Sequence, residues 1–241
     1  MLNKIIIEQP WGGLGDNLQY TTLPELYTTL GYEVYISSKN AYRNPEIYDL
    51  VWKLNPFIKN ISDETPNAGA CKYFEGLHKS ISEHSIRNIE YAHGITFGSE
   101  KYPKIYYNPK VIQDLSNTLI LDITNISSHI TFDISLIEKQ LTKIMKLYPN
   151  LKPLKITFKN IKNRDLQSLT CDEYIINNIY EYCDVINSCK IFVSPPSGNY
   201  CLASSIKQDR EFPLIYCFND QNIFNFKPGD NHWYSNKILI T

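Results

Sequence analysis

Residues 4–37 read KIIIEQPWGGLGDNLQYTTLPELYTTLGYEVYIS, and this stretch decides the fold class. A β-rich run at 4–8 is followed by a turn-like segment at 10–16 and then by apolar residues at helical spacing from 17 to 30. Gly31 is the residue type that ends helices, and a second β-rich run, EVYIS, comes directly after it. The stretch therefore predicts a strand, turn, helix, strand unit.

Pro24 modifies this prediction because it lies inside the helical segment. An interior proline costs a helix about 3 kcal/mol through a lost hydrogen bond and a ring clash. We therefore expect the helix either to kink at Pro24 or to begin close to it.

The same alternation of strands and helices returns in the second half of the chain. Segments 44–61 and 74–94 are predicted as mixed or helical, and 102–109 as an extended crossing segment. Beyond them we expect strands at 117–122, 154–158, 190–193 and 213–218 and helices at 132–147, 173–187 and 199–206. Alternating strands and helices favour parallel sheets joined by right-handed crossovers. We predict an α/β fold of two lobes, 1–110 and 111–241.

Composition limits the classes of partner. The 241 residues carry 24 basic and 25 acidic side chains, so no excess of basic charge favours nucleic acid or an anionic membrane. The apolar run at 5–7 is too short for a signal peptide, and no run approaches the roughly 18–20 apolar residues of a membrane span. We expect a cytoplasmic protein, with peripheral membrane contact only through a surface patch.

Cysteine and histidine spacing does not indicate a metal site. The six cysteines show no C-x-x-C pair, and the five histidines show no ligand spacing with one another or with carboxylates. We therefore predict free thiols, no bound metal and no cofactor.

Two turns follow predicted strands at the edge where parallel sheets bind their ligands. The first contains Gly13 and Gly15, which let a ligand approach the backbone. The second offers hydroxyl, amide and backbone N–H groups at the start of a helix, which suits a diphosphate. Its candidate residues are Ser194, Ser197, Gly198 and Asn199. An ordinary turn that caps a buried helix is the alternative for this second turn.

Asp16 is the candidate catalytic residue of the first turn. The third glycine of a dinucleotide fingerprint is absent, because Gly15 is followed by Asp16, Asn17 and Leu18. A carboxylate there would also repel a pyrophosphate, but it could accept a proton from a sugar hydroxyl as that oxygen attacks an activated anomeric carbon. The alternative is that Asp16 only caps the helix.

Taken together, the two turns resemble those of a known family. The run WGGLGDNLQYTTLPELY at 11–27 resembles the N-terminal motif of the heptosyltransferase-like glycosyltransferases of family 9, which also carries a proline in its helix. The run IFVSPPSGNYCLASSI at 191–206 is similar to that family's C-terminal Asp-Thr-Gly-x-x-His-Leu-Ala motif. These two stretches cover a small part of the chain.

The resemblance implies the GT-B architecture, in which two Rossmann-like lobes bind the acceptor and the nucleotide sugar. Lobe 1–110 would face the acceptor and lobe 111–241 the donor, with Asp16 as base of a metal-independent, inverting transfer. In the second motif Pro196 replaces an aspartate and Cys201 replaces a histidine, so the resemblance does not identify the donor sugar nucleotide. The sequence GGLGD also resembles the start of GDP-fucose-dependent transferases, so ADP- and GDP-sugars both stay open.

Asn17, His93 and Tyr200 are further candidates for an acceptor site or cleft, because they lie near the turns or at a predicted helix end. Asp122 ends a predicted strand, where it either meets a donor or caps the next turn.

The sequence therefore predicts a glycosyltransferase acting on a glycan or lipid-linked glycan of the surface polysaccharide or lipopolysaccharide type. The alternative is a non-catalytic nucleotide-sugar or glycan-binding protein that has lost its donor residues. A nicotinamide-dependent Rossmann enzyme is disfavoured by the missing glycine.

Overall fold

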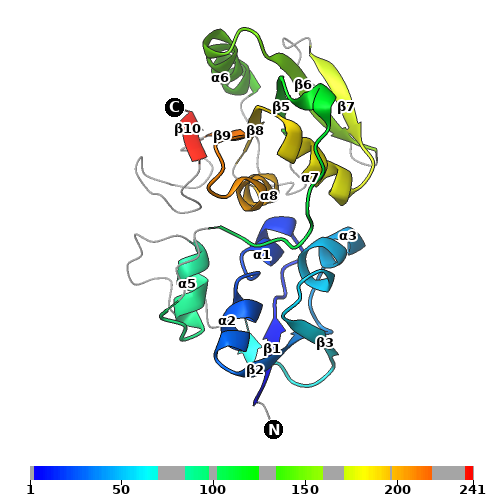
Figure 1. Ribbon diagram of the computed structural model, residues 1–241, viewed down its shortest axis with the longest axis vertical. Coiled ribbons are helices and arrows are strands. Elements are labelled where there is room, and N and C mark those ends of the chain that lie inside the picture. The colour runs from blue at the N-terminus through cyan, green and yellow to red at the C-terminus, as the bar shows by residue number, and fades with distance from the viewer. Residues whose placement is uncertain are drawn as a thin grey trace. The chain divides into compact units, whose positions relative to one another are not determined.

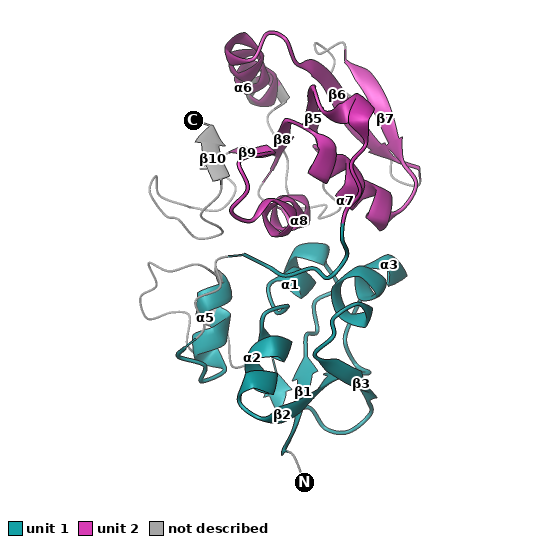
Figure 2. Ribbon diagram, in the orientation of Figure 1, with its two compact units in different colours: residues 1–108, 231–235 teal, residues 109–230, 236–241 magenta. Residues whose placement is uncertain are grey.

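The computed structural model describes residues 3–69, 85–97, 102–124, 134–159, 171–195, 197–218 and 237–240. Described residues up to 108 form one compact unit, and those from 109 onward form a second (Figure 2). The sequence placed the boundary at 110/111. Each unit contains a parallel sheet with helices, so the predicted α/β class is confirmed.

The sheet of the first unit has the strand order β3-β2-β1-β4. Figure 1 labels β1, β2 and β3 of this sheet. All of its described strand pairs are parallel, and Ile5 and Ile7 of β1 lie opposite Val34 and Ile36 of β2. The strands are β1 (Asn3–Glu8), β2 (Tyr32–Ser37), β3 (Ile58–Ser62) and β4 (Ala68–Gly69). The helices are α1 (Leu14–Leu18), α2 (Leu23–Thr29), α3 (Pro45–Tyr48), the π-helical η1 (Asp49–Lys53) and α5 (Ser85–Ala92).

The sheet of the second unit has the order β10-β9-β8-β5-β6-β7, and its described strand pairs are all parallel. Its strands are β5 (Thr118–Leu121), β6 (Lys152–Phe158), β7 (Asp172–Ile176), β8 (Ile191–Ser194), β9 (Leu214–Phe218) and β10 (Lys237–Ile240). Its helices are the short 3-10 helix η3 (Gln113–Leu115), α6 (Ile134–Leu147), α7 (Ile179–Ser188) and α8 (Gly198–Lys207).

Alternate residues of the central strands pack against helices on opposite faces of the second sheet. Leu119 and Leu121 of β5 form a buried cluster with Ile137, Leu141 and Ile144 of α6. Phe192 of β8 instead contacts Tyr182 of α7. Because both faces are covered, the strands read as continuous apolar runs, which made them recognisable in the sequence.

The single helix predicted at 17–30 is in fact two helices. α1 ends at Leu18 and α2 begins at Leu23, with Thr22 as its N-cap. Pro24 occupies the first turn of α2, where its missing N–H removes no helical hydrogen bond. The expectation that a helix begins close to Pro24 is confirmed.

Four strands, β3, β4, β7 and β10, were missed, and one predicted helix was too long. β3 overlaps the end of the segment 44–61 that was predicted as mixed helix, β4 lies in the polar stretch 62–69 for which a loop was expected, and β10 was not predicted. The helix predicted at 173–187 is wrong over β7, because α7 begins only after Asn178. The Asn178 side chain accepts hydrogen bonds from the backbone of Tyr180 and Glu181, and this cap marks the true helix start.

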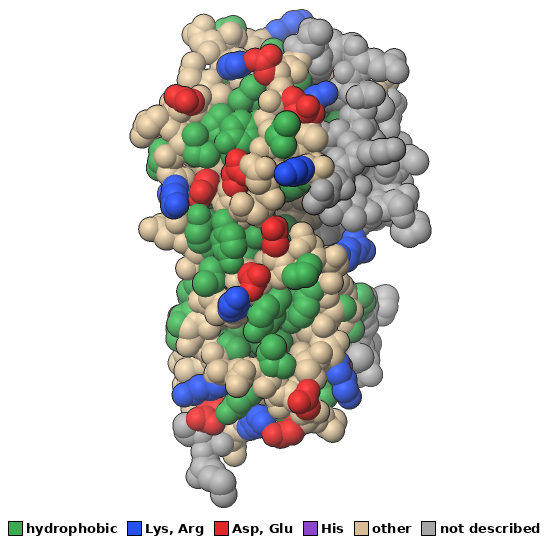
Figure 3. Space-filling view, turned by 90° about the vertical axis from the view of Figure 1, so that its right-hand side faces the viewer, with side chains coloured by type: hydrophobic (Ala, Val, Ile, Leu, Met, Phe, Trp, Pro, Cys, Tyr) green, Lys and Arg blue, Asp and Glu red, His purple; other side chains and the backbone are tan. Residues whose placement is uncertain are grey.

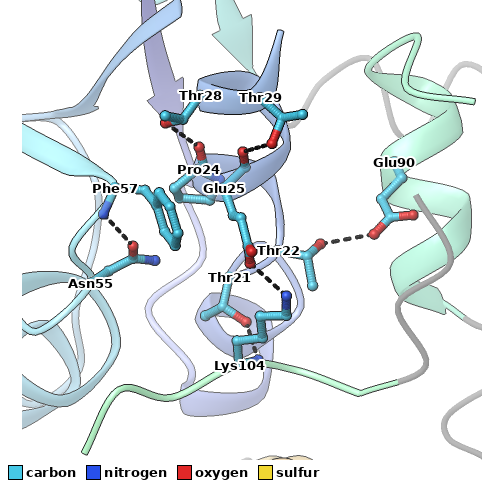
Figure 4. A network of polar contacts seen from close by, with 10 residues as sticks. All are labelled: Thr21, Thr22, Pro24, Glu25, Thr28, Thr29, Asn55, Phe57, Glu90 and Lys104. Atoms are coloured by element: carbon cyan, nitrogen blue, oxygen red, sulfur yellow. Dashed lines mark hydrogen bonds and ion pairs between the residues drawn. The ribbon is translucent and has the colours of Figure 1, made fainter. Parts of the chain in front are cut away.

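A buried polar network ties α2 to α5 in the first unit (Figure 4). The Thr22 hydroxyl donates to Glu90 over 3.0 Å, and Arg87 pairs with the other Glu90 oxygen at 2.9 Å. Nearby, Lys104 pairs with Glu25 at 2.5 Å at the molecular surface. The Glu90 side chain is 0% exposed whereas that of Glu25 is 36% exposed, so the two carboxylates differ mainly in burial.

Acidic and basic side chains are interspersed with apolar ones on the face shown in Figure 3. Among the described residues, no helix has both the length and the apolar character needed to cross a membrane.

The difference in burial between Glu90 and Glu25 leads to a prediction about stability. Replacing a buried ion-pair partner leaves an uncompensated charge, so Glu90→Gln should lower the free energy of unfolding by about 3 kcal/mol. The matched variant Glu25→Gln should lower it by less than about 1 kcal/mol, because exposed pairs contribute little. Urea unfolding of both variants measures the difference, and equal effects would contradict the role given to Glu90.

Candidate functional site

The glycine-rich turn is tied to the segment that follows β2. Gln9, just past β1, donates its backbone N–H to Asn40 Oδ1 over 2.9 Å. The backbone N–H of Arg43 donates to the Gly12 carbonyl over 2.9 Å. β1 and β2 are adjacent parallel strands, so these loops lie together at the carboxyl edge of the first sheet.

Steric contacts explain two of the glycines in this turn. A Cβ at Gly12 would lie 3.1 Å from both the backbone N and the Cγ of Arg43. A Cβ at Gly13 would lie 2.5 Å from Asp16 Oδ2, closer than real Cβ contacts allow. Gly13 is therefore required so that the Asp16 carboxylate can fold back over the turn. Gly15 lies inside α1, and its carbonyl accepts the N–H of Gln19 over 3.2 Å.

Asp16 lies in the first turn of α1, with Gly13 as the N-cap. Its carboxylate accepts a hydrogen bond from the Gly13 backbone, which is the contact of a capping carboxylate. Burial raises the pKa of Asp16, while the Gly13 hydrogen bond and the Arg43 guanidinium oppose that rise. Asp16 thus fulfils the capping role, and its raised pKa makes it a stronger proton acceptor than an exposed aspartate.

Asn17 lies in the core and not in a cleft. Its Nδ2 donates to the carbonyls of Trp11 and Gly13 over 3.1 and 2.9 Å, and its Oδ1 accepts from Trp52 Nε1 over 2.8 Å. The side chain is fully buried. We therefore replace the predicted acceptor role of Asn17 with a structural one, in which it holds the turn in shape.

His93 and Tyr200 also pack against protein groups. His93 follows α5, and its Nδ1 lies 2.9 Å from the hydroxyl of Tyr27 in α2. Its ring makes edge-on contacts with Tyr20 and Tyr27. Tyr200 is fully buried within α8, so its ring presents no face for a sugar to stack on. The structure gives no support to a cleft role for Tyr200.

The second turn leads from β8 into α8. The Ser194 hydroxyl is buried and donates to the Pro195 carbonyl over 3.1 Å. Ser197 is the N-cap of α8, but its side chain makes no capping hydrogen bond. Within the described part of the chain, the enclosed Ser197 hydroxyl has no hydrogen-bond partner. Gly198 begins the helix, and Asn199 Nδ2 donates to the Thr124 carbonyl over 2.9 Å. Ser197 is therefore the hydroxyl of this turn that remains available for a ligand.

Asp122 directly follows β5 and is fully buried. Its Oδ1 accepts from the backbone N–H and the hydroxyl of Thr124 over 2.8 and 2.5 Å, so it caps the next turn as the sequence suggested. Its Oδ2 accepts from the hydroxyl of Tyr182 in α7. Burial raises the pKa of Asp122 to about 6, although hydrogen bonds from Thr124, Tyr182 and Asn199 partly offset that effect.

Sequence reasoning missed Gln9, Arg43 and Thr124 at these two sheet edges. Each of them comes soon after the end of a strand, and this position is the only signal that the sequence carried. Gln9 is fully buried, and among the described residues its Nε2 has no hydrogen-bond partner. A buried donor beside the turn could bind an oxygen atom of a ligand or of a bound water.

Within the described residues, no group of three or more His, Cys, Asp or Glu side chains is placed to hold a metal ion. Among the described residues, cysteines 171, 183, 189, 201 and 217 form no disulfide bond, and Cys71 lies outside the described residues. Pro196 and residues 219–222, which the sequence predicts as a loop after the strand at 213–218, also lie outside them.

The titration of Asp122 predicts a pH-dependent stability. Its folded-state pKa of about 6 exceeds the ordinary value of 3.8, so the folded state binds a proton more tightly and gains stability as the pH falls through 6 toward 4. The gain is on the order of 3 kcal/mol. Asp122→Asn lacks this titration, so the melting temperature of the wild type minus that of the variant should rise between pH 8 and pH 4. A constant difference would contradict the buried, titrating carboxylate.

Comparison with known proteins gives a match at the level of structure. No family model matches the sequence, and no curated protein matches it. The iron-containing dodecameric glycosyltransferase TibC from enterotoxigenic E. coli H10407 superposes with a TM-score of 0.67 at 14% identity. That match covers 98% of this chain and 62% of TibC, so the chain spans less than two thirds of the TibC length.

Two further solved structures agree with this result. The family 9 glycosyltransferase from Veillonella parvula DSM 2008 has a TM-score of 0.60 at 10% identity, over 98% of this chain and 85% of its own. E. coli heptosyltransferase WaaC with ADP has a TM-score of 0.54 at 7% identity, and the match covers 98% of this chain and 92% of WaaC. These similarities confirm the predicted fold class, and the chain has the GT-B fold of the heptosyltransferase-like glycosyltransferases of family 9.

Proposed function

We propose that the chain is a glycosyltransferase that moves a sugar from a nucleotide-sugar donor to a glycan acceptor. The observation that carries the proposal is the Ser197 hydroxyl, which is enclosed at the start of α8 and has no hydrogen-bond partner among the described residues. This group lies where the fold family has its C-terminal motif, next to the end of a parallel strand. The shared fold with solved glycosyltransferases supports the same assignment.

The start of α8 suits a diphosphate. The first backbone N–H groups of a helix point outward without helical partners, and the helix dipole adds a partial positive charge there. The turn supplies the Ser197 hydroxyl as a further donor beside Gly198. Oriented donors of this kind stabilise the charge that develops on a departing diphosphate. In our proposal, the backbone of 197–199 and the Ser197 hydroxyl bind the donor phosphates.

The identity of the donor is proposed by comparison. A second TibC structure is a complex with ADP-D-β-D-heptose, and the WaaC structure contains ADP. We therefore place ADP-sugars first and GDP-sugars second. Cys201 occupies the position of the family's histidine, and its side chain is buried within α8. Donor contacts in this chain would come from other residues of the turn.

Asp16 is the general base of the proposed reaction. An acceptor hydroxyl would give its proton to the Asp16 carboxylate while its oxygen attacks the anomeric carbon, and the bond to the donor diphosphate breaks. One such displacement inverts the anomeric configuration, and the proposal assigns no step to a metal. The raised pKa of Asp16 and its fixed position over Gly13 favour this role. The acceptor would be a surface polysaccharide or lipopolysaccharide-type glycan, and the reaction would be cytoplasmic.

One observation favours a second candidate. The buried thiol of Cys201 replaces the family's histidine, so the chain could bind a nucleotide sugar or glycan without catalysing transfer. Release of free nucleoside diphosphate from a bound donor separates the two functions, because only an active enzyme breaks that bond.

Asp16→Asn tests the catalytic assignment. The asparagine keeps an oxygen that can accept from Gly13, but it cannot take up a proton at neutral pH. We expect kcat for transfer to fall by about 10²–10⁴-fold with little change in donor affinity. Asp49→Asn is the matched control, since Asp49 forms an exposed ion pair with Lys53 in η1. Transfer by Asp16→Asn at the wild-type rate would exclude Asp16 as the base.

Ser197→Ala tests the donor site. A ligand at about 100 times its Kd stabilises the folded state by about 2.7 kcal/mol, so thermal-shift measurements with ADP-, GDP-, UDP- and CDP-sugars should identify the donor. We expect the shift to shrink in Ser197→Ala and to persist in Ser205→Ala, whose hydroxyl donates within α8 to Leu202. Equal shifts in both variants would place the donor elsewhere.

A further inference from the structure

Asp122 lies where β5 and β8 reach the edge that carries the second turn. Its backbone N–H donates to the Val193 carbonyl over 2.9 Å, so the main chain at Asp122 extends the pairing of β5 with β8. The side chain is fully buried. Its position is therefore fixed by the sheet before any ligand binds.

Hydrogen bonds connect this carboxylate to the start of α8. Both the backbone N–H and the hydroxyl of Thr124 donate to Asp122 Oδ1. The Thr124 carbonyl then accepts from Asn199 Nδ2 over 2.9 Å, and Thr124 Oγ1 lies 3.4 Å from the same nitrogen. Asn199 is the second residue of α8. The carboxylate thus fixes Thr124, and Thr124 holds the first turn of the helix.

Tyr182 holds the other side of the carboxylate. Its hydroxyl donates to Asp122 Oδ2, and its ring makes an edge-on contact with Phe158 at a centroid distance of 5.0 Å. The groups that donate hydrogen bonds to the carboxylate from the 122–124 loop, α7 and α8 are all neutral. Asp122 therefore lacks an ion-pair partner among the groups that bind it.

Stability alone does not account for this residue. Burial raises the pKa of Asp122 to about 6, so at neutral pH the folded protein keeps a desolvated charge that a neutral side chain would avoid. Ionisable groups whose pKa is strongly shifted by burial are concentrated at functional sites. What the carboxylate does provide is two oxygens that accept three hydrogen bonds, two from Thr124 and one from Tyr182 of α7.

We propose that Asp122 is a positioning residue of the donor site, which acts through Thr124 and Asn199 to hold the N-terminal turn of α8 in its binding geometry. The inference rests on the donor site proposed above. Asp122 itself does not touch the donor, because it is enclosed and its charge would repel a diphosphate. It acts through its acceptor oxygens, which orient the residues that do bind.

The test compares variants that separate hydrogen bonding from charge. Asp122→Ala removes both acceptor oxygens, whereas Asp122→Asn removes the charge and keeps one oxygen for Thr124. Thr124→Val removes the hydroxyl that donates to Asp122, and Thr124→Ser keeps it. Both variants leave the Asp122 carboxylate in place. Donor affinity is measured by calorimetry at pH 8 with the nucleotide sugar that gives the largest thermal shift in the wild type, and KM for donor and acceptor is measured with the same variants.

The proposal expects a donor Kd about tenfold higher or more in Asp122→Ala and Thr124→Val, and a Kd within about threefold of wild type in Asp122→Asn and Thr124→Ser. The acceptor KM should not change. If Asp122 had only a structural role, its variants would have a lower melting temperature but would not weaken donor binding selectively over acceptor binding. In the double variant Asp122→Ala/Asn199→Ala, the Kd should be close to that of the weaker single variant, because both act through one chain of contacts.

The outcomes separate this inference from the function on which it rests. If the wild type binds no nucleotide sugar, the proposed function fails. If the wild type binds one and Thr124→Val and Asp122→Ala bind it equally well or more tightly, the positioning role is wrong. Should Asp122→Ala fail to fold, the comparison of Thr124→Val with Thr124→Ser decides alone.

Discussion

Parallel pairing of the strands is the constraint on which the rest of the structure depends. Every described strand pair in both sheets is parallel, so within each sheet the carboxyl ends of the strands lie along one edge. β1 ends at the glycine-rich turn, and β8 ends at the turn before α8. The segments between strands therefore have two roles, because they connect parallel strands across the sheet and also form its ligand-binding edge.

Loops at such an edge must satisfy the polar groups that they bury. Asn17 does this for the first turn by binding two backbone carbonyls and the Trp52 indole. In the second unit Asp122 does it for Thr124, at the expense of a desolvated carboxylate. Gln9 Nε2 and the Ser197 hydroxyl are both enclosed and lack a hydrogen-bond partner among the described residues, and of these two Ser197 lies at the start of a helix.

The sequence predicted the parallel α/β fold because buried strands and amphipathic helices have strong, distinct patterns. It failed where the pattern was weak or mixed. β7 has exposed residues at the edge of its sheet and runs directly into α7, so its apolar residues were taken for helix. β4 is only two residues long, which is too short for any periodicity. The break between α1 and α2 was partly predicted, because proline has a positional rule of its own.

The candidate site was predictable only to the level of the two turns. Gly13 and Asp16 were recognisable by residue type, but the contact that makes Gly13 necessary depends on how the carboxylate folds back. The sequence offered Asn17 and Tyr200 as candidates for a cleft, but both side chains are buried. Thr124 and Gln9 carry no chemical signature, and only the topology brings them to the site edges.

The most direct test of the account is an amide NMR titration of the ¹⁵N-labelled protein with ADP and with the best-binding nucleotide sugar. We predict that the largest saturable shifts occur at Ser197, Gly198 and Asn199, with smaller ones at Thr124. Saturable shifts confined to other segments, with 197–199 unaffected, would contradict the claim that the start of α8 binds the donor.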